Sequence, residues 1–67
     1  MTQLEEAMMD HLKGQRAYHV ANWTTFLANP TGVAEHGDFM ETLEQTLEKI
    51  AHYDELIQTL ETLTFDA

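Results

Sequence analysis

The chain has 67 residues, no cysteine, and twelve acidic against three basic side chains, for a formal net charge of −9. Without cysteine it cannot form a disulfide or a cysteine-type zinc site. Three bases are too few to neutralise the phosphates of a nucleic acid, and the same charge disfavours an anionic membrane. We expect one small domain, residues 1–67, and a cytoplasmic location, because the start MTQLEEAMMD is acidic where a signal peptide is basic.

The first predicted helix spans residues 2–28. Thr2 and Glu5 have the spacing of a capping box, with Thr2 as the N-cap. The pair Asn29-Pro30 ends the helix, because proline disfavours helical geometry in the residue before it. A row of small residues would let another helix approach closely: Gly14, Ala17, Ala21, Thr24 and Ala28.

Residues 29–37 form the predicted loop, since NPTGVAEHG holds the only proline and two of the three glycines. Val33 and Ala34 could form a single turn there. The second helix is predicted over 38–63, with Asp38 and Glu41 as its capping box. A short loop between helices of matched length predicts an all-α, antiparallel two-helix hairpin.

The second predicted helix has an apolar face. Its apolar side chains recur at steps of three and four residues, the period of one helical face: Phe39, Leu43, Leu47, Ile50, Tyr53, Ile57 and Leu60. The predicted core combines this face with four side chains of the first helix: Leu43, Leu47, Ile50, Ile57 and Leu60 with Leu4, Met8, Leu12 and Trp23.

The apolar residues of the first helix spread too widely for one partner helix to cover. Over its second half they point around more than half of the circumference: Tyr18, Val20, Trp23, Phe26 and Leu27. A chain this short buries only about 60% of its unfolded surface and is marginal as a monomer. We therefore predict that two hairpins dimerise into a four-helix bundle. The residues expected in its core and dimer contact are Leu12, Tyr18, Trp23, Leu43, Leu47, Ile50, Ile57 and Leu60.

The opposite face of the second helix is acidic. It carries one base, Lys49, against five glutamates: Glu41, Glu44, Glu48, Glu55 and Glu61. A negative surface favours basic partners at long range, although solubility alone would also explain it. We predict a non-enzymatic protein-binding module whose partner surface comprises Glu41, Glu44, Glu48, Glu55 and, in the loop, His36. The alternative is a DNA mimic, in which carboxylates along a rod imitate phosphates and inhibit a nucleic-acid-binding enzyme.

The histidines suggest a further alternative, a metal-binding helical bundle. His52 lies between Glu48 and Glu55 on one face of the second helix. Carboxylate-bridged di-iron bundles use Glu-x-x-His, however, and the step from Glu48 to His52 is one residue longer. We therefore predict no metal and no other cofactor.

Four polar residues of the first helix share a face by their spacing: His11, Gln15, His19 and Asn22. A polar row of this kind fixes the register of a helical interface or recognises a partner. In the loop, Glu35 and His36 resemble an acid–base pair, but no nucleophile or pocket accompanies them. We therefore expect no catalysis.

Two segments carry a family resemblance: HLKGQRAYHVAN at 11–22 and NPTGVAEHGDF at 29–39. They resemble short helical-hairpin proteins encoded by marine T4-like and cyanobacterial phages. The resemblance covers about half of the chain and implies a viral accessory protein that acts inside an infected bacterium, as an adaptor or inhibitor of a host protein. It carries no assigned activity and no functional residues.

Overall fold

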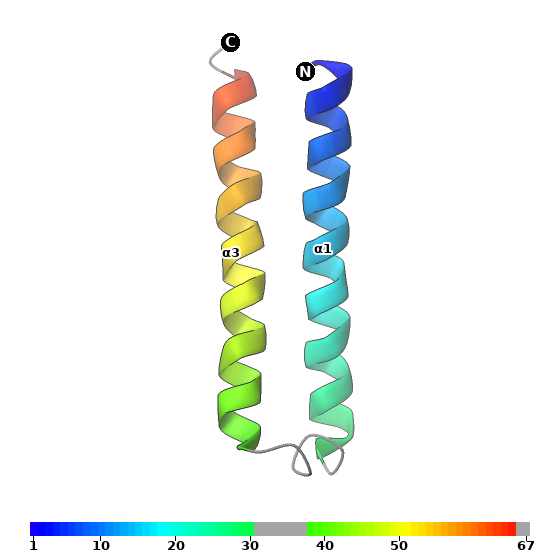
Figure 1. The fold of residues 1–67 in the computed structure, drawn as a ribbon, viewed down its shortest axis with the longest axis vertical. Helices are drawn as coiled ribbons and strands as arrows, with labels where there is room; N and C mark the ends of the chain where they lie inside the picture. The colour runs from blue at the N-terminus through cyan, green and yellow to red at the C-terminus, as the bar shows by residue number, and fades with distance from the viewer. Residues whose placement is uncertain (31–37, 66–67) are drawn as a thin grey trace.

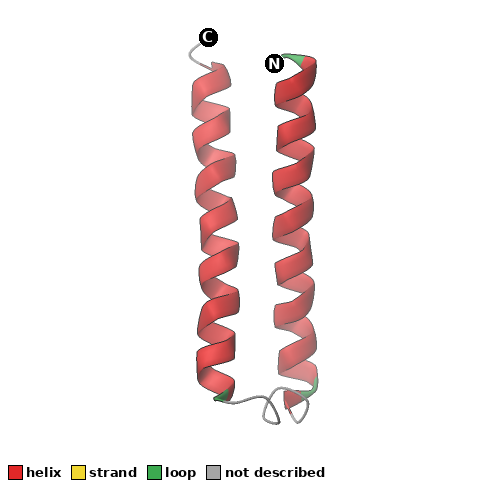
Figure 2. Cartoon of the chain, in the orientation of Figure 1, coloured by secondary structure: helices red, strands yellow, loops and turns green. Residues whose placement is uncertain are grey.

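The computed structural model describes residues 1–30 and 38–65. Two long helices make up almost all of them: α1, Gln3–Ala28, and α3, Phe39–Phe65. The helices lie side by side and run in opposite directions, so the two chain ends lie together at one end of the molecule (Figure 1). The result is a single-layer rod with extents of 47 × 16 × 15 Å. The predicted all-α antiparallel hairpin is confirmed (Figure 2).

Side-chain caps begin both helices. The Thr2 hydroxyl accepts a bond from the Glu5 N–H at 3.1 Å, while the Glu5 carboxylate accepts one from the Thr2 N–H at 2.8 Å. These bonds, chiefly the one from the Thr2 backbone, lower the pKa of Glu5 below its ordinary value of 4.5. Asp38 caps α3, because its carboxylate accepts from the N–H groups of Met40 and Glu41. At the end of α1, the Asn29 N–H donates to the Thr25 carbonyl.

The helices meet along a seam whose residues alternate by steps of three and four. On α1 the seam consists of Met9, Leu12, Arg16, His19, Trp23 and Phe26. On α3 it consists of Phe39, Leu43, Thr46, Ile50, Tyr53, Ile57, Leu60 and Thr64. Only Met9, Leu12, Leu43 and Thr46 are less than a tenth exposed, so the core of the described hairpin is thin.

Three residues of the predicted core are exposed in the hairpin. Leu4 is 79% exposed, Met8 48% and Leu47 53%. The prediction placed them inside because it followed apolar identity at successive steps of four. An α-helix has 3.6 residues per turn, so two successive steps of four residues move a side chain off the contact face. Steps of four must alternate with steps of three for the side chains to stay on that face.

Two residues that the prediction omitted occupy the seam instead. Met9 is buried where Met8 was expected, and Thr46 is buried where Leu47 was expected. The Thr46 hydroxyl donates to the Thr42 carbonyl at 2.9 Å. That bond satisfies the polar atom, which removes the main cost of burying threonine.

The row of small residues on α1 is not used within the hairpin. Gly14, Ala17, Ala21, Thr24 and Ala28 are all exposed, and a Cβ added at Gly14 would meet no atom within 4 Å. The expectation that another helix packs closely against this row is therefore wrong for α3. The predicted turn at Val33 and Ala34 falls outside the described residues.

Candidate protein-interaction site

The outer side of α3 carries an acidic ridge, which we define as Glu41, Glu44, Glu48 and Glu55. Glu41, Glu48 and Glu55 follow one another at intervals of seven residues, about 10.5 Å along the helix. All four side chains are exposed. They point away from α1 because the seam residues of α3 lie on the opposite side of the helix. Four of the five glutamates predicted on this face thus form one surface. The prediction was wrong for Glu61, which lies seven residues after Asp54, the partner of Arg16, and therefore flanks the seam.

At the loop end of the rod, the ridge borders a hollow of about 660 Å³. Four apolar side chains and three carboxylates line it: Trp23, Met40, Leu43 and Leu47 with Asp38, Glu41 and Glu44. An apolar wall next to carboxylates suits a side chain with a hydrocarbon stem and a positive tip, which describes lysine and arginine. This hollow is the most specific chemical feature of the acidic surface.

Ion pairing leaves the ridge uncompensated among the described residues. The one ion pair within residues 1–30 and 38–65 joins Arg16 of α1 to Asp54 of α3, beside the ridge. Both side chains are about half exposed, so the pair contributes little to stability. Glu41 accepts a 3.4 Å bond from the neutral Gln45 amide, which does not offset its charge. The ridge therefore keeps its negative potential.

The structure brings some predicted site residues together and leaves others apart. Glu41 and Glu44 meet at the hollow, whereas Glu48 and Glu55 lie farther along the ridge. His36 lies outside the described residues, so its part in a partner surface stays a prediction. The sequence analysis missed that Met40 and Leu47 lie beside the glutamates. Their spacing of seven residues, each one place after a seam residue, was the available signal.

His19 departs from the predicted polar row. It lies in the seam, where its ring stacks on Tyr53 with centroids 5.7 Å apart and an interplanar angle of 20°. Tyr18 and His52 meet this pair edge-on, at 5.1 Å from His19 and 5.3 Å from Tyr53. His11 is exposed on another side of α1. The four rings therefore form one aromatic cluster that bridges the middle of the hairpin.

Among the described residues, no three His, Cys, Asp or Glu side chains lie close enough together to hold a metal ion. In the same part of the chain, neither helix combines the length and apolar character needed to cross a bilayer. Comparisons with protein-family models, curated proteins and solved structures found no match.

Proposed function

We propose that the chain is a non-enzymatic protein-binding module that binds a basic surface of another protein through the acidic ridge. The observation that carries the proposal is the hollow at the loop end, where Glu41 and Glu44 stand beside Trp23 and Leu47. A lysine or arginine inserted there gains apolar contact along its stem and opposite charge at its tip. Solubility alone would not require carboxylates to be placed beside an apolar hollow.

The chemistry of the partner follows from the shape and charge of the ridge. Its three glutamates spaced by seven residues match a partner that presents basic side chains along a straight element, such as an amphipathic helix. The resemblance of residues 11–22 and 29–39 to phage hairpins suggests a host protein, with this chain as its adaptor or inhibitor.

We further propose that the hairpin acts as a homodimer, a four-helix bundle. The support is the thin seam of the described hairpin, in which only four side chains are less than a tenth exposed. A second copy would cover apolar side chains that α1 and α3 leave exposed. Dimerisation would also double the number of ridges per assembly, which strengthens binding to a repeated partner.

Charge reversal on the ridge tests the partner surface. The triple variant Glu41→Lys, Glu48→Lys, Glu55→Lys is expected to lose the partner captured from a bacterial lysate, because it reverses the attraction at three points. A matched variant, Glu6→Lys, Asp10→Lys, Glu61→Lys, makes the same change in net charge at exposed sites off the ridge and should retain the partner. Mass spectrometry of the captured proteins is the measurement, with circular dichroism to verify helicity.

Salt dependence provides a second readout of the same contact. Raising the ionic strength from 0.1 M to 1 M shortens the Debye length from about 10 Å to about 3 Å, so ridge binding should weaken steeply. Equal capture by the ridge variant and the parent at 0.1 M salt would rule the ridge out.

The DNA-mimic alternative makes a different prediction. Duplex DNA carries one charge per about 1.7 Å of axis, whereas the glutamates at intervals of seven residues stand about 10.5 Å apart. This sparse spacing disfavours mimicry. If added duplex DNA nevertheless displaces the captured protein, the partner is a nucleic-acid-binding protein and the mimic becomes the better reading.

A further inference from the structure

One side of the hairpin carries no acidic side chain on either helix. On α1 this acid-free face consists of Leu4, Met8, His11, Gln15, Tyr18, Asn22 and Thr25. On α3 it consists of Thr42, Gln45, Lys49, His52, Leu56, Thr59 and Leu63. Its one formally charged group is Lys49. In a chain with twelve acids this separation leaves a face on which copies of the chain do not repel one another.

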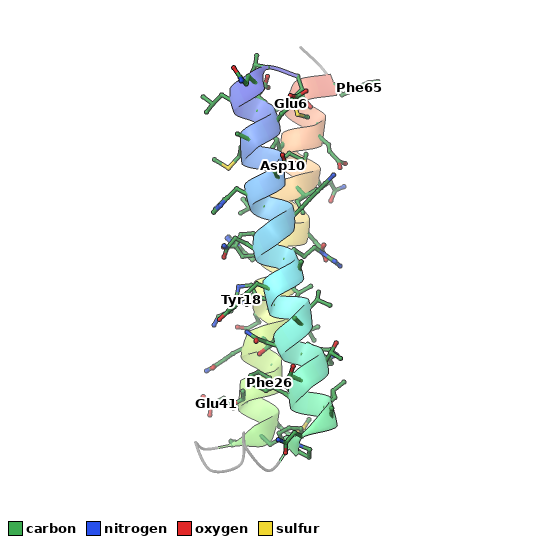
Figure 3. All side chains as sticks on the ribbon, turned by 90° about the vertical axis from the view of Figure 1, so that its right-hand side faces the viewer. Glu6, Asp10, Tyr18, Phe26, Glu41 and Phe65 are labelled. Carbon is green, nitrogen blue, oxygen red and sulfur yellow. The ribbon has the colours of Figure 1, made fainter. Side chains whose placement is uncertain are left out.

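The two rows lie on the same side because of how the helices are aligned. Arg16 pairs with Asp54, and His19 stacks on Tyr53, so this antiparallel register sets Met8 level with Leu63. Met8 and Leu63 each precede a seam residue by one position, and in antiparallel helices such positions flank the seam on one side. In Figure 3, Tyr18 of this face lies on the left of the molecule, with Glu41 beside the face at the loop end, and Phe65 projects on the right.

The end of the acid-free face near the chain termini is apolar. We name Leu4, Met8, Leu56 and Leu63 the terminal patch. Their exposed fractions range from 36% for Leu56 to 79% for Leu4. Toward the loop end the same face becomes polar but neutral, with Asn22, Thr42 and Gln45. On the acid-free face, the exposed apolar surface that favours association therefore lies at the end near the chain termini.

We infer that the terminal patch docks the terminal patch of a second copy of this chain, an assignment that rests on the proposed dimer and specifies its interface. A two-fold axis through the patch brings Leu63 near its counterpart and the Leu4 side chains into the same contact. This geometry is isologous, since one surface serves both subunits. The acidic ridges remain on the outside of the assembly.

Charge favours a second copy over other occupants. Two copies that met through their acidic sides would bring carboxylates together, while contact through the acid-free face avoids this cost. The patch itself holds no charged residue, so it offers nothing to select a charged partner. An apolar, uncharged surface can pack against an identical surface without bringing like charges together.

The exposed area agrees with one missing partner. The chain exposes 5068 Å², whereas a folded monomer of 7.7 kDa exposes about 4,300 Å² by the general scaling of area with mass. The excess, about 770 Å², is close to the roughly 800 Å² that each subunit contributes to a standard interface. Covering one side of the 47 × 16 × 15 Å rod would bring the exposed area of the chain closer to that of a globular protein of its mass.

Two leucines of α3 provide a matched test by analytical ultracentrifugation. Leu63, at 64% exposed, lies in the patch, while Leu47, at 53%, lies outside it beside the hollow. Leu63→Glu and Leu47→Glu remove the same side chain and add the same charge. We expect Leu63→Glu to weaken the dimer at least about tenfold, as loss of an interface side chain does, and Leu47→Glu to dimerise as the parent does. Circular dichroism checks that both stay helical.

Cysteine pairing tests the same face without disturbing an apolar residue. The parent has no cysteine, so Thr59→Cys, between Leu56 and Leu63 on the face, and Thr62→Cys, one turn away on the outer side, introduce unique thiols. A short bismaleimide should join Thr59→Cys chains faster. A monomeric parent, an intact Leu63→Glu dimer or equal cross-linking at the two positions overturns the assignment. Partner capture by the ridge is measured separately, so its success or failure stays distinguishable from these outcomes.

Discussion

Thr46 illustrates how this hairpin accommodates a polar residue in its seam. The side chain is 7% exposed, and its hydroxyl is bonded to the carbonyl one turn earlier. The methyl group then occupies the contact with α1 while the polar atom stays satisfied within α3. Two other polar side chains in the middle of the seam also have partners there: Arg16 pairs with Asp54, and His19 stacks on Tyr53. Because each of these side chains has its own partner on α3, the contacts also fix the register of the two helices.

Leu43 and Leu47 should respond differently to truncation. Leu43→Ala removes a buried side chain from the seam and should cost about 2–5 kcal/mol of unfolding free energy. Leu47→Ala removes an exposed one and should cost less than about 0.5 kcal/mol. Urea unfolding followed by circular dichroism measures both. Similar losses at the two positions would show that Leu47 lies in the core after all.

The spacing of Thr2 and Glu5, the cap residue Asp38 and the pair Asn29-Pro30 were sufficient to predict the hairpin and its helix ends. Asp38 caps α3 as predicted, but the Glu41 carboxylate accepts from Gln45 and does not complete a capping box. The period of the apolar residues was sufficient to predict that Leu12 and Leu43 are buried and Ile50 partly buried, but it did not predict the burial of Met9 or Thr46. Adjacent methionines cannot be told apart by composition, and a buried threonine looks like a surface residue until its hydroxyl bond is known. The hollow depends on Trp23 of α1 meeting α3, a tertiary contact that sequence spacing alone does not reveal.

At the scale of the element, the start of α1 is its most clearly defined part. Thr2 and Glu5 exchange two hydrogen bonds that satisfy backbone N–H groups left free by the helix. The last turns of both helices, by contrast, hold no basic residue that would offset the negative end of the helix dipole. The N-terminal box of α1 therefore anchors the end of the hairpin that carries the terminal patch.

The Glu5 carboxylate makes this anchor depend on pH. Its folded pKa is lowered from 4.5, so its stabilising effect is fully present above 4.5 and is lost as pH falls through the lower folded value. We expect the melting temperature of the parent to exceed that of Glu5→Gln at neutral pH, with the difference shrinking toward acid pH. Glu6→Gln changes the next residue, which is outside the capping box. Its difference in melting temperature from the parent should change less with pH. A difference for Glu5→Gln that is constant with pH would contradict this account.

At the scale of the molecule, the acidic ridge and the terminal patch occupy separate sides of one rod. The ridge offers carboxylates that pair with no base among residues 1–30 and 38–65, and an apolar hollow at the loop end, whereas the terminal patch offers neutral apolar surface at the other end. Because the two surfaces share no residue, partner binding and self-association can be altered independently by mutation. This separation makes the proposed binding role and the inferred docking face separately testable.

If the hairpin dimerises through the terminal patch, its thermal stability must depend on its concentration. Association stabilises the folded state by mass action, so the melting temperature of the parent should rise across a hundredfold range of protein concentration. Leu63→Glu should melt at a temperature that changes less over that range, and Leu47→Glu should follow the parent. Differential scanning calorimetry measures this, and concentration-independent melting of the parent would indicate a monomer.

The alternation of the seam has a consequence for the length of the molecule. From Met9 to Phe26 and from Phe39 to Thr64 the contact positions repeat as heptads without an inserted or missing residue. Straight helices drift out of such a repeat by about 20° per heptad, so it favours a left-handed supercoil. Deleting seven residues from each helix, at positions that face one another, should therefore leave a shorter hairpin. Each remaining residue would keep its face, so the ridge and the acid-free face would stay separate. Removing four or five would rotate one half of each helix against the other and merge the two surfaces.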